Sequence, residues 1–173
     1  MYGYITVPPS RAARARLGEL DNAGDAAYEP HSIVGPDGFP EKGPADGTIA
    51  SGGNTRFSRL DEQSSTGWNK MNLPEGLDGI TVTWTMTAPG PTRTFEYFIT
   101  KNGWNSDKPL DRDAFEPEPF AVFDLENTSP PYTVEHEVSW PKDRSGYHVI
   151  LGVWNFADTP DAVYQAVDVN IGT

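Results

Sequence analysis

The side chains best able to bind a transition metal are three histidines, His31, His136 and His148, because the chain has no cysteine. Imidazole nitrogen is a common zinc and copper ligand, but metal sites often place two histidines only a few residues apart. No two of these histidines stand at such a spacing. We therefore expect framework roles for them, and a metal site built from all three is the alternative.

Acidic side chains suggest two further sites, neither with a specific pattern. A stretch that could hold calcium contains Asp107, Asp111, Asp113, Glu116 and Glu118. Its spacing lacks the loop pattern of strong calcium sites, so a solvated face is expected. Glu135 and Glu137 point to the same side of a predicted strand, as the two carboxylates of a glycosidase could. Nothing else in the sequence supports that role, so we interpret them as surface charges.

The overall charge limits the partners. Asp and Glu number 25 against 13 Lys and Arg, which gives a formal net charge of −12. Because nucleic acids and anionic membranes are polyanions as well, neither is expected as the main partner. A neutral polysaccharide is compatible with this charge.

Elements that could position such residues are clearest in the second half of the chain. There, apolar and polar residues alternate, which predicts strands with one buried face. The predicted strands are 80–87, 94–101, 132–140, 147–156 and 163–171. Trp84 and Trp140 fall on apolar faces and are expected in the core. With proline and glycine clusters between the runs, this predicts an all-β antiparallel sandwich, in one domain spanning residues 1–173.

The first half is less regular. Ser10 could cap a short helix over residues 11–20, because its hydroxyl can accept a hydrogen bond from an early helical amide. Residues 28–79 are rich in Gly, Pro, Asp and Asn and show little periodicity. A connection of that length is usually functional or contains small elements of its own.

The start of the chain shows no apolar run preceded by basic residues, and no segment has the length of a membrane span. The chain as written is therefore expected to be cytoplasmic and not inserted into a membrane. An extracellular location is the alternative, if Met1 replaces a signal peptide or if the protein is released within a larger particle.

Motifs along nearly the whole chain resemble one family. They are Gly3-Tyr4-Ile5, Pro9-Ser10-Arg11, Tyr28-Glu29-Pro30-His31-Ser32, Phe39-Pro40, residues 43–51, Trp68-Asn69-Lys70, residues 97–101, residues 143–151, Val153-Trp154, Ala157-Asp158-Thr159 and Tyr164-Gln165-Ala166. In this order they resemble the bacterial chitin-active lytic polysaccharide monooxygenases, or chitin-binding type-4 domains. The resemblance implies an immunoglobulin-like or fibronectin type III-like sandwich with a long loop region, short helices near the N-terminus and a flat polysaccharide-binding face.

The resemblance also implies where a copper site would stand. In the family, a mature N-terminal histidine binds copper through its α-amine and its ring, and a second histidine supplies a third nitrogen. Here the first position falls on Tyr2, the second on Gly90, and an axial aromatic position on Val163. A phenol is not a ready neutral ligand, and glycine has no side chain. We therefore expect no copper, no other cofactor and no enzymatic activity.

On the flat face, the resemblance assigns glycan contacts to Tyr28, Glu29, Thr87, Asp158 and Asp161. An exposed Tyr28 would stack on the C–H face of a sugar ring, and the alternative is a ring that packs on its own loop. The polar residues would bind hydroxyl or acetamido groups, or be solvated surface only. Val34 replaces a glutamate frequent in chitin-binding members, which removes one polar contact.

Together these features predict a non-catalytic, copper-free member of the family that binds chitin or a related insoluble glycan. One alternative is a structural or interaction subunit on the same fold, for instance in a phage-tail-like contractile injection particle, with protein partners in a larger assembly. An engineered scaffold without copper and cysteine is another, and an enzyme with a new copper site is a third.

Overall fold

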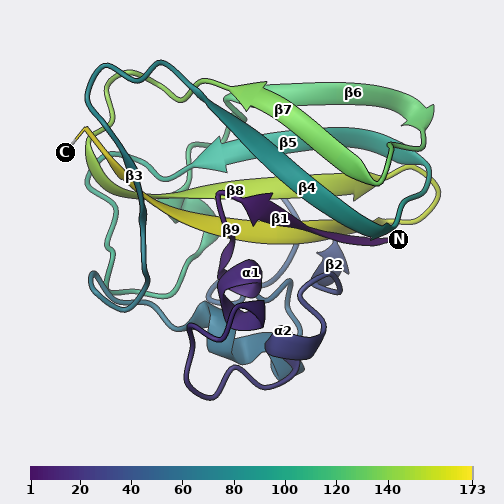
Figure 1. The fold of residues 1–173 in the computed structure, drawn as a ribbon, viewed down its shortest axis with the longest axis horizontal. Helices are drawn as coiled ribbons and strands as arrows, with labels where there is room; N and C mark the ends of the chain where they lie inside the picture. The colour runs from purple at the N-terminus through teal and green to yellow at the C-terminus, as the bar shows by residue number, and fades with distance from the viewer. Residues whose placement is uncertain (173) are drawn as a thin grey trace.

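The computed structural model describes residues 1–172 and places two β-sheets face to face (Figure 1). The smaller sheet has the order β1-β4-β7, and the larger has β2-β9-β8-β5-β6 with β3 also paired to β9. The strands are β1 Tyr2–Val7, β2 Val34–Pro36, β3 Met71–Leu73, β4 Ile80–Ala88, β5 Thr92–Ile99, β6 Ala121–Thr128, β7 Thr133–Val138, β8 Gly146–Phe156 and β9 Asp161–Ile171. Every pairing except that of β3 is antiparallel. The predicted antiparallel sandwich is confirmed.

Short helices fill part of the first half. They are α1 Arg11–Arg16, α2 Asp25–Tyr28 and the 3-10 helices η1 Thr55–Asp61 and η2 Arg112–Ala114. The predicted cap of α1 is confirmed, because the Ser10 hydroxyl accepts a hydrogen bond from the Ala13 amide at 3.1 Å. The predicted end at residue 20 was wrong. Leu17 already caps the helix, and Gly18 takes a φ of +80°, a left-handed conformation that ends helices.

The larger sheet is buried on both faces. One face packs on the smaller sheet around Trp84 and Trp154, and the other packs on the helices and the loop region around Phe57 and Leu151. Figure 1 shows α1 and α2 gathered beside β9, at the bottom of the view. Burial from both sides explains why residues 147–156 are apolar without alternation. Trp84 and Trp140 lie in the core as predicted, 0% and 4% exposed.

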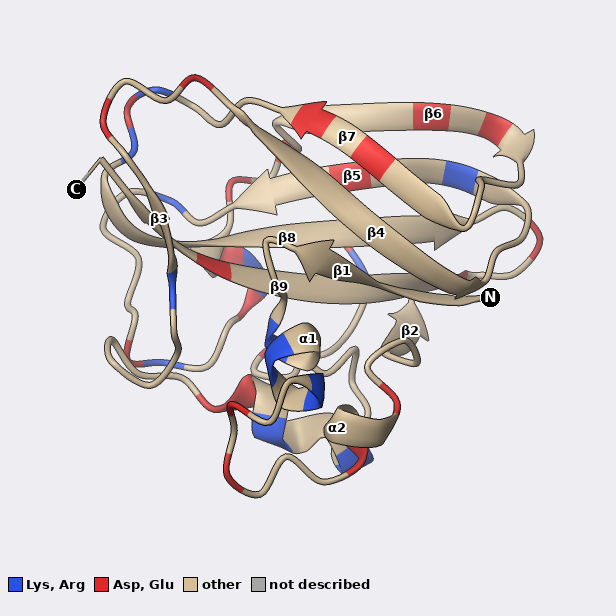
Figure 2. Cartoon of the chain, viewed as in Figure 1, with Lys and Arg blue, Asp and Glu red and all other residues tan. Residues whose placement is uncertain are grey.

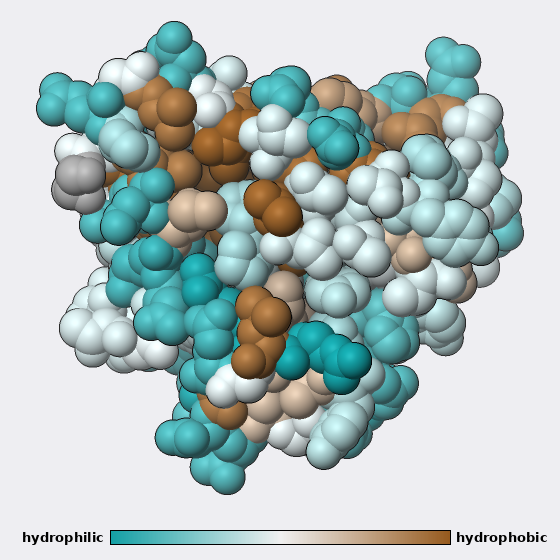
Figure 3. Space-filling view, viewed as in Figure 1, coloured by the Kyte–Doolittle hydropathy of each residue, from teal (hydrophilic) through white to brown (hydrophobic). Residues whose placement is uncertain are grey.

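The surface is polar and unevenly charged. Strands β6 and β7 carry acidic charges only, whereas arginines concentrate in α1 and the segments near it (Figure 2). Over the middle of the smaller sheet the surface is mostly of intermediate hydropathy (Figure 3), because threonines alternate with buried apolar residues along β4. No helix among residues 1–172 is long and apolar enough to cross a membrane.

A buried ion pair fastens the helical region to the larger sheet. The Arg11 guanidinium donates to both Asp168 carboxylate oxygens at 2.9 Å, and both side chains are 1% exposed. Arg11 also donates to the Leu60 carbonyl at 2.9 Å and lies 4.5 Å from the ring centroid of Trp68. One arginine therefore joins α1, η1 and β9, and it helps to fix the region that carries α2 and Tyr28.

A second buried network lies between the sheets. The Trp84 indole N–H donates to the Tyr97 hydroxyl at 2.9 Å, and this hydroxyl lies 2.6 Å from Nδ1 of His136. Because the Tyr97 oxygen already accepts from Trp84, its proton is free to point to His136, whose Nδ1 then carries no proton. The Phe123 ring stacks on His136 at 4.0 Å. Burial in this apolar setting lowers the pKa of His136 to about 4.

We expect acidification to destabilise the protein through His136. The unfolded-state pKa is near 6.5, so the unfolded chain takes up this proton first, and stability is lost as the pH falls from about 6.5 to about 4. The loss at pH 4 is about 2 to 3 kcal/mol. Urea unfolding across this range measures it, and His136→Asn, which keeps an acceptor for Tyr97, should flatten the slope. Parallel pH profiles for parent and variant would contradict this assignment.

Candidate functional site

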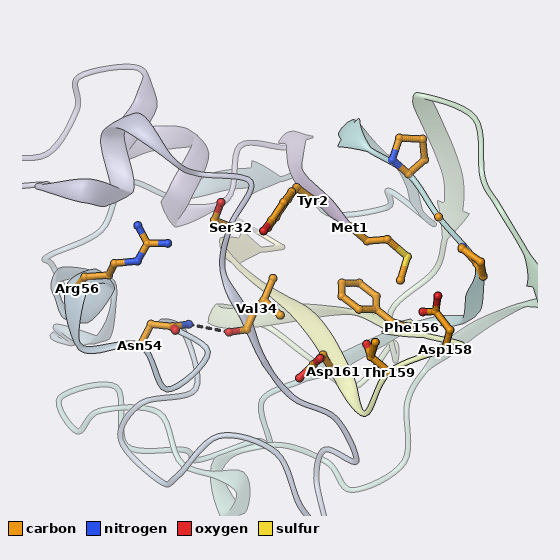
Figure 4. A pocket seen from close by; sticks show the side chains of 13 residues that line it. Met1, Tyr2, Ser32, Val34, Asn54, Arg56, Phe156, Asp158, Thr159 and Asp161 are labelled. Atoms are coloured by element: carbon orange, nitrogen blue, oxygen red, sulfur yellow. Dashed lines mark hydrogen bonds between the residues drawn. The ribbon is translucent and has the colours of Figure 1, made fainter.

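A hollow of about 600 Å³ opens at one end of the sandwich (Figure 4). Its wall comes from the N-terminus, from the segments around Ser32 and Asn54, from the loop between β4 and β5, and from residues 156–161. In Figure 1 this end is on the right, where the N-terminus and β2 lie close together. Residues far apart in the sequence therefore share one site.

Strand pairing explains why these segments meet. Tyr2 is paired with Ala88 at the end of β4, so β1 begins beside the turn that contains Gly90. Val34 of β2 is paired with Val163 of β9, which places β2 along the opposite wall. Asn54 fixes this wall from the loop region, because its side-chain amide donates to the Val34 carbonyl at 2.8 Å.

Met1 fills the space beside Gly90. A Cβ atom built on Gly90 would lie 2.5 Å from both Cγ and Sδ of Met1, which is far inside van der Waals contact. A side chain at position 90 and the observed Met1 conformation therefore exclude each other. Tyr2, 44% exposed, presents its ring at the hollow's edge, where it contacts the His31 ring edge-on at 5.8 Å between centroids. The residues that line the hollow include no histidine.

Comparison with known proteins identifies the family. The family model described as "Lytic polysaccharide mono-oxygenase, cellulose-degrading" matches residues 2–169. The chain belongs to the lytic polysaccharide monooxygenase family. A solved lytic polysaccharide monooxygenase from Photorhabdus luminescens superposes with a TM-score of 0.93 at 40% identity, covering 98% of both chains. The catalytic domain of one from Listeria monocytogenes gives 0.91 at 47% identity, covering 99% of both chains.

Curated relatives of this monooxygenase-family chain are longer. A GlcNAc-binding protein A from Shewanella oneidensis is 43% identical over 172 residues, and one from Photobacterium profundum is 41% identical over 179 residues. These matches cover 99% and 97% of this chain but 36% of each relative. The chain thus spans about a third of the length of the curated relatives it matches.

The predicted brace-related positions meet in the structure of this family member. Tyr2 and Gly90 line the same hollow. Val163 lies behind this wall in the core, 0% exposed, between its strand partners Val34 and Trp154. Tyr2 and Gly90 therefore share one hollow and Val163 does not line it, and the sequence gave no sign that Met1 would lie beside Gly90.

Tyr28 is the most exposed large apolar side chain of the protein's described part, at 78%. It ends α2, a four-residue helix held by the Glu29 amide, which donates to the Asp25 carbonyl at 2.8 Å. The alternative in which this ring packs on its own loop does not agree with such exposure. The ring is free to contact a ligand.

Glu29 is not a free carboxylate. It forms a salt bridge with Arg56, whose guanidinium also lies 3.8 Å from Asp25 and 4.3 Å from the ring centroid of Phe57. Arg56 lines the hollow as well, so it links α2 to the site. Sequence reasoning missed Arg56, because it lies in the irregular segment 28–79, which carries no periodicity to mark it.

The remaining predicted contacts divide into two groups. Asp158, in the turn between β8 and β9, and Asp161, at the start of β9, both line the hollow. Thr87 is exposed near the end of β4 and does not line it. A wider ligand would be needed to reach Thr87 and the hollow together.

The other candidate sites have structural partners. His148 lies 2.7 Å from the Thr100 hydroxyl, and His136 belongs to the network of Tyr97. In the acidic stretch, Asp111 caps η2 through the Ala114 amide at 2.9 Å, and Glu116 pairs with Arg144 at 2.8 Å. Within residues 1–172, no group of three or more histidine, aspartate or glutamate side chains could hold a metal ion.

Proposed function

We propose that this chain is a non-catalytic polysaccharide-binding domain of the lytic polysaccharide monooxygenase family, folded as one domain over residues 1–173. Its ligand is chitin or a related insoluble glycan, held on the end of the sandwich that carries Tyr28. The observation that carries the loss of activity is the packing of Met1 against Gly90 in a hollow without histidine.

A copper ion of the family's kind does not fit the side chains of this hollow. Its nitrogen ligands would have to come from positions 2 and 90, which hold a phenol and a glycine. The Met1 thioether is a soft ligand, and alone it does not replace two imidazoles for Cu(II). The axial position is filled by the buried aliphatic side chain of Val163. These features support a protein that takes no cofactor.

Glycan binding is supported by Tyr28 and by the relatives. A pyranose presents a face of C–H groups, and an exposed aromatic ring that covers this face removes both surfaces from water. Relatives about 40% identical are named GlcNAc-binding proteins, which fits chitin as the ligand class and an extracellular encounter with it. Thr87, Asp158 and Asp161 would supply polar contacts around the ring.

A structural or interaction subunit is the second candidate. The feature that favours it is the complete absence of cysteine from a chain of 173 residues, which is unusual for a domain that works outside the cell. Copurification with a large particle would support this role. It requires no intact glycan-binding face.

We expect Tyr28→Ala to lower binding to insoluble chitin by roughly tenfold, because the exposed ring then no longer covers a sugar. A pull-down on chitin and on cellulose measures the bound fraction. Leu77→Ala is the control, since Leu77 is also exposed (40%) but lies between β3 and β4 beside Ile171 and Gly172, away from the hollow and from Thr87. Equal losses in both variants, or no binding by the parent, would refute a Tyr28-based glycan face.

A further inference from the structure

We propose that the hollow beside Tyr2 and Gly90 binds a protonated amino sugar, as in deacetylated stretches of chitin, in preference to the N-acetylated sugar. This inference rests on the proposed function, because it names the sugar that the glycan-binding face holds best. It follows from the charges of the hollow, from its hydrogen-bonding groups and from its size.

Asp158 and Asp161 are the acidic side chains that line the hollow, and neither forms a salt bridge within the part of the chain that the structure describes. Together they outnumber the single α-ammonium group of Met1 at the same wall. Arg56 is the one cationic side chain at the wall, and it is held by Glu29 and Asp25. The hollow therefore favours a cation.

One further polar group is left for a ligand. Ser32 lines the hollow and is only 8% exposed, yet its hydroxyl has no hydrogen-bond partner among residues 1–172. Among the described residues, Nε of Arg14 is the one buried side-chain polar atom without a partner, so the Ser32 hydroxyl reaches solvent in the hollow and is open to a polar ligand. Phe156, 4% exposed, and Val34 give the same hollow apolar surface for the C–H groups of a sugar.

The acetylated sugar and the amino sugar need different hydrogen-bonding groups from the hollow. An acetamido group is neutral, and its carbonyl needs a donor. The Asn54 amide already donates to the Val34 and Ser51 carbonyls at 2.8 and 2.9 Å, and Arg56 is engaged with Glu29. An ammonium group needs acceptors instead, and two carboxylates supply them through charge-assisted hydrogen bonds. The volume of about 600 Å³ lies within the usual range of small-ligand sites, about 300–1,000 Å³, and exceeds that of one sugar ring.

Calorimetry with short soluble oligomers of glucosamine and of N-acetylglucosamine tests the preference, in low salt and at mildly acidic pH. We expect the parent to bind the glucosamine oligomer at least about tenfold more tightly. Asp158→Asn/Asp161→Asn should abolish this preference. Glu118→Gln/Glu135→Gln removes the same number of negative charges from exposed positions that do not line the hollow, and it should keep the preference.

Equal weakening of glucosamine binding in both double variants would reduce the effect to general surface charge and overturn the inference. Equal affinity of the parent for both oligomers would overturn it too, yet leave the proposed glycan face intact. Absence of binding to both oligomers and to insoluble chitin would remove the proposed function itself. A pH series on the parent alone is a further test, and it needs no variant that could misfold. Raising the pH until the sugar amine loses its proton should erase the preference. A preference that persists there contradicts the inference.

Discussion

A chain that starts at position 2, with Met1 removed and the substitutions Tyr2→His and Gly90→His, is expected to bind one Cu(II) ion tightly, whereas the parent is not. Removing Met1 clears the space for the new side chain, because the three atoms nearest to a Cβ added at Gly90 all belong to the Met1 side chain. The gain in affinity should be on the order of a thousandfold, since even secondary contacts of metal ligands change affinity by about 10- to 100-fold. Calorimetric titration and electron paramagnetic resonance measure it.

The matched control keeps Met1 and carries the same two substitutions. Its imidazole at position 90 must displace the Met1 side chain from its observed position, and the α-amine is displaced by one residue, so copper should bind much more weakly than in the shortened chain. Tight binding of one copper ion by the unmodified parent would show that the hollow retains a metal site, and the proposal of a non-catalytic domain would then fail.

The strands of the second half could be predicted because burial of one face leaves a period of two in the sequence. Five predicted runs correspond to β4, β5, β7, β8 and β9. The strand β6 was missed, although Ala121, Phe123 and Leu125 alternate along it, because these side chains are only half-buried at a sheet edge among acidic residues. Its last residues include Glu126 and Asn127 with positive φ, which further obscures the pattern.

The residues of the site could be predicted only where the sequence resembles the motifs of the family. Tyr2 and Gly90 were placed together by analogy with the family, and strand pairing brings them into one hollow. The contact between Met1 and Gly90 and the salt bridge between Glu29 and Arg56 have no sequence signal. Both depend on how loops from separate elements pack, and an irregular loop carries no periodicity that reveals its contacts.

The same limit applies to the buried ion pair of Arg11 and Asp168, which no sequence pattern marked. Arg11 and Asp168 are separated by 157 residues and meet only when α1 packs on β9. Asp168 also accepts a hydrogen bond from the Tyr147 hydroxyl at 2.6 Å, and Gln63 bonds to both Arg11 and Tyr147. Removing one charge therefore leaves several buried groups without partners.

We expect Asp168→Ala to lower the free energy of unfolding by about 3 to 5 kcal/mol, because the Arg11 guanidinium then stays buried without its counter-ion. Arg11→Met/Asp168→Leu should cost clearly less than the sum of its single changes, since it removes both charges together. Denaturant unfolding measures all variants. The exposed pair Lys142–Asp78 is the reference, and Asp78→Asn should cost at most about 1 kcal/mol. If Asp168→Ala cost no more than Asp78→Asn, the buried pair would not be what holds α1 to the larger sheet, and apolar packing around Trp68 and Leu60 would have to do so alone.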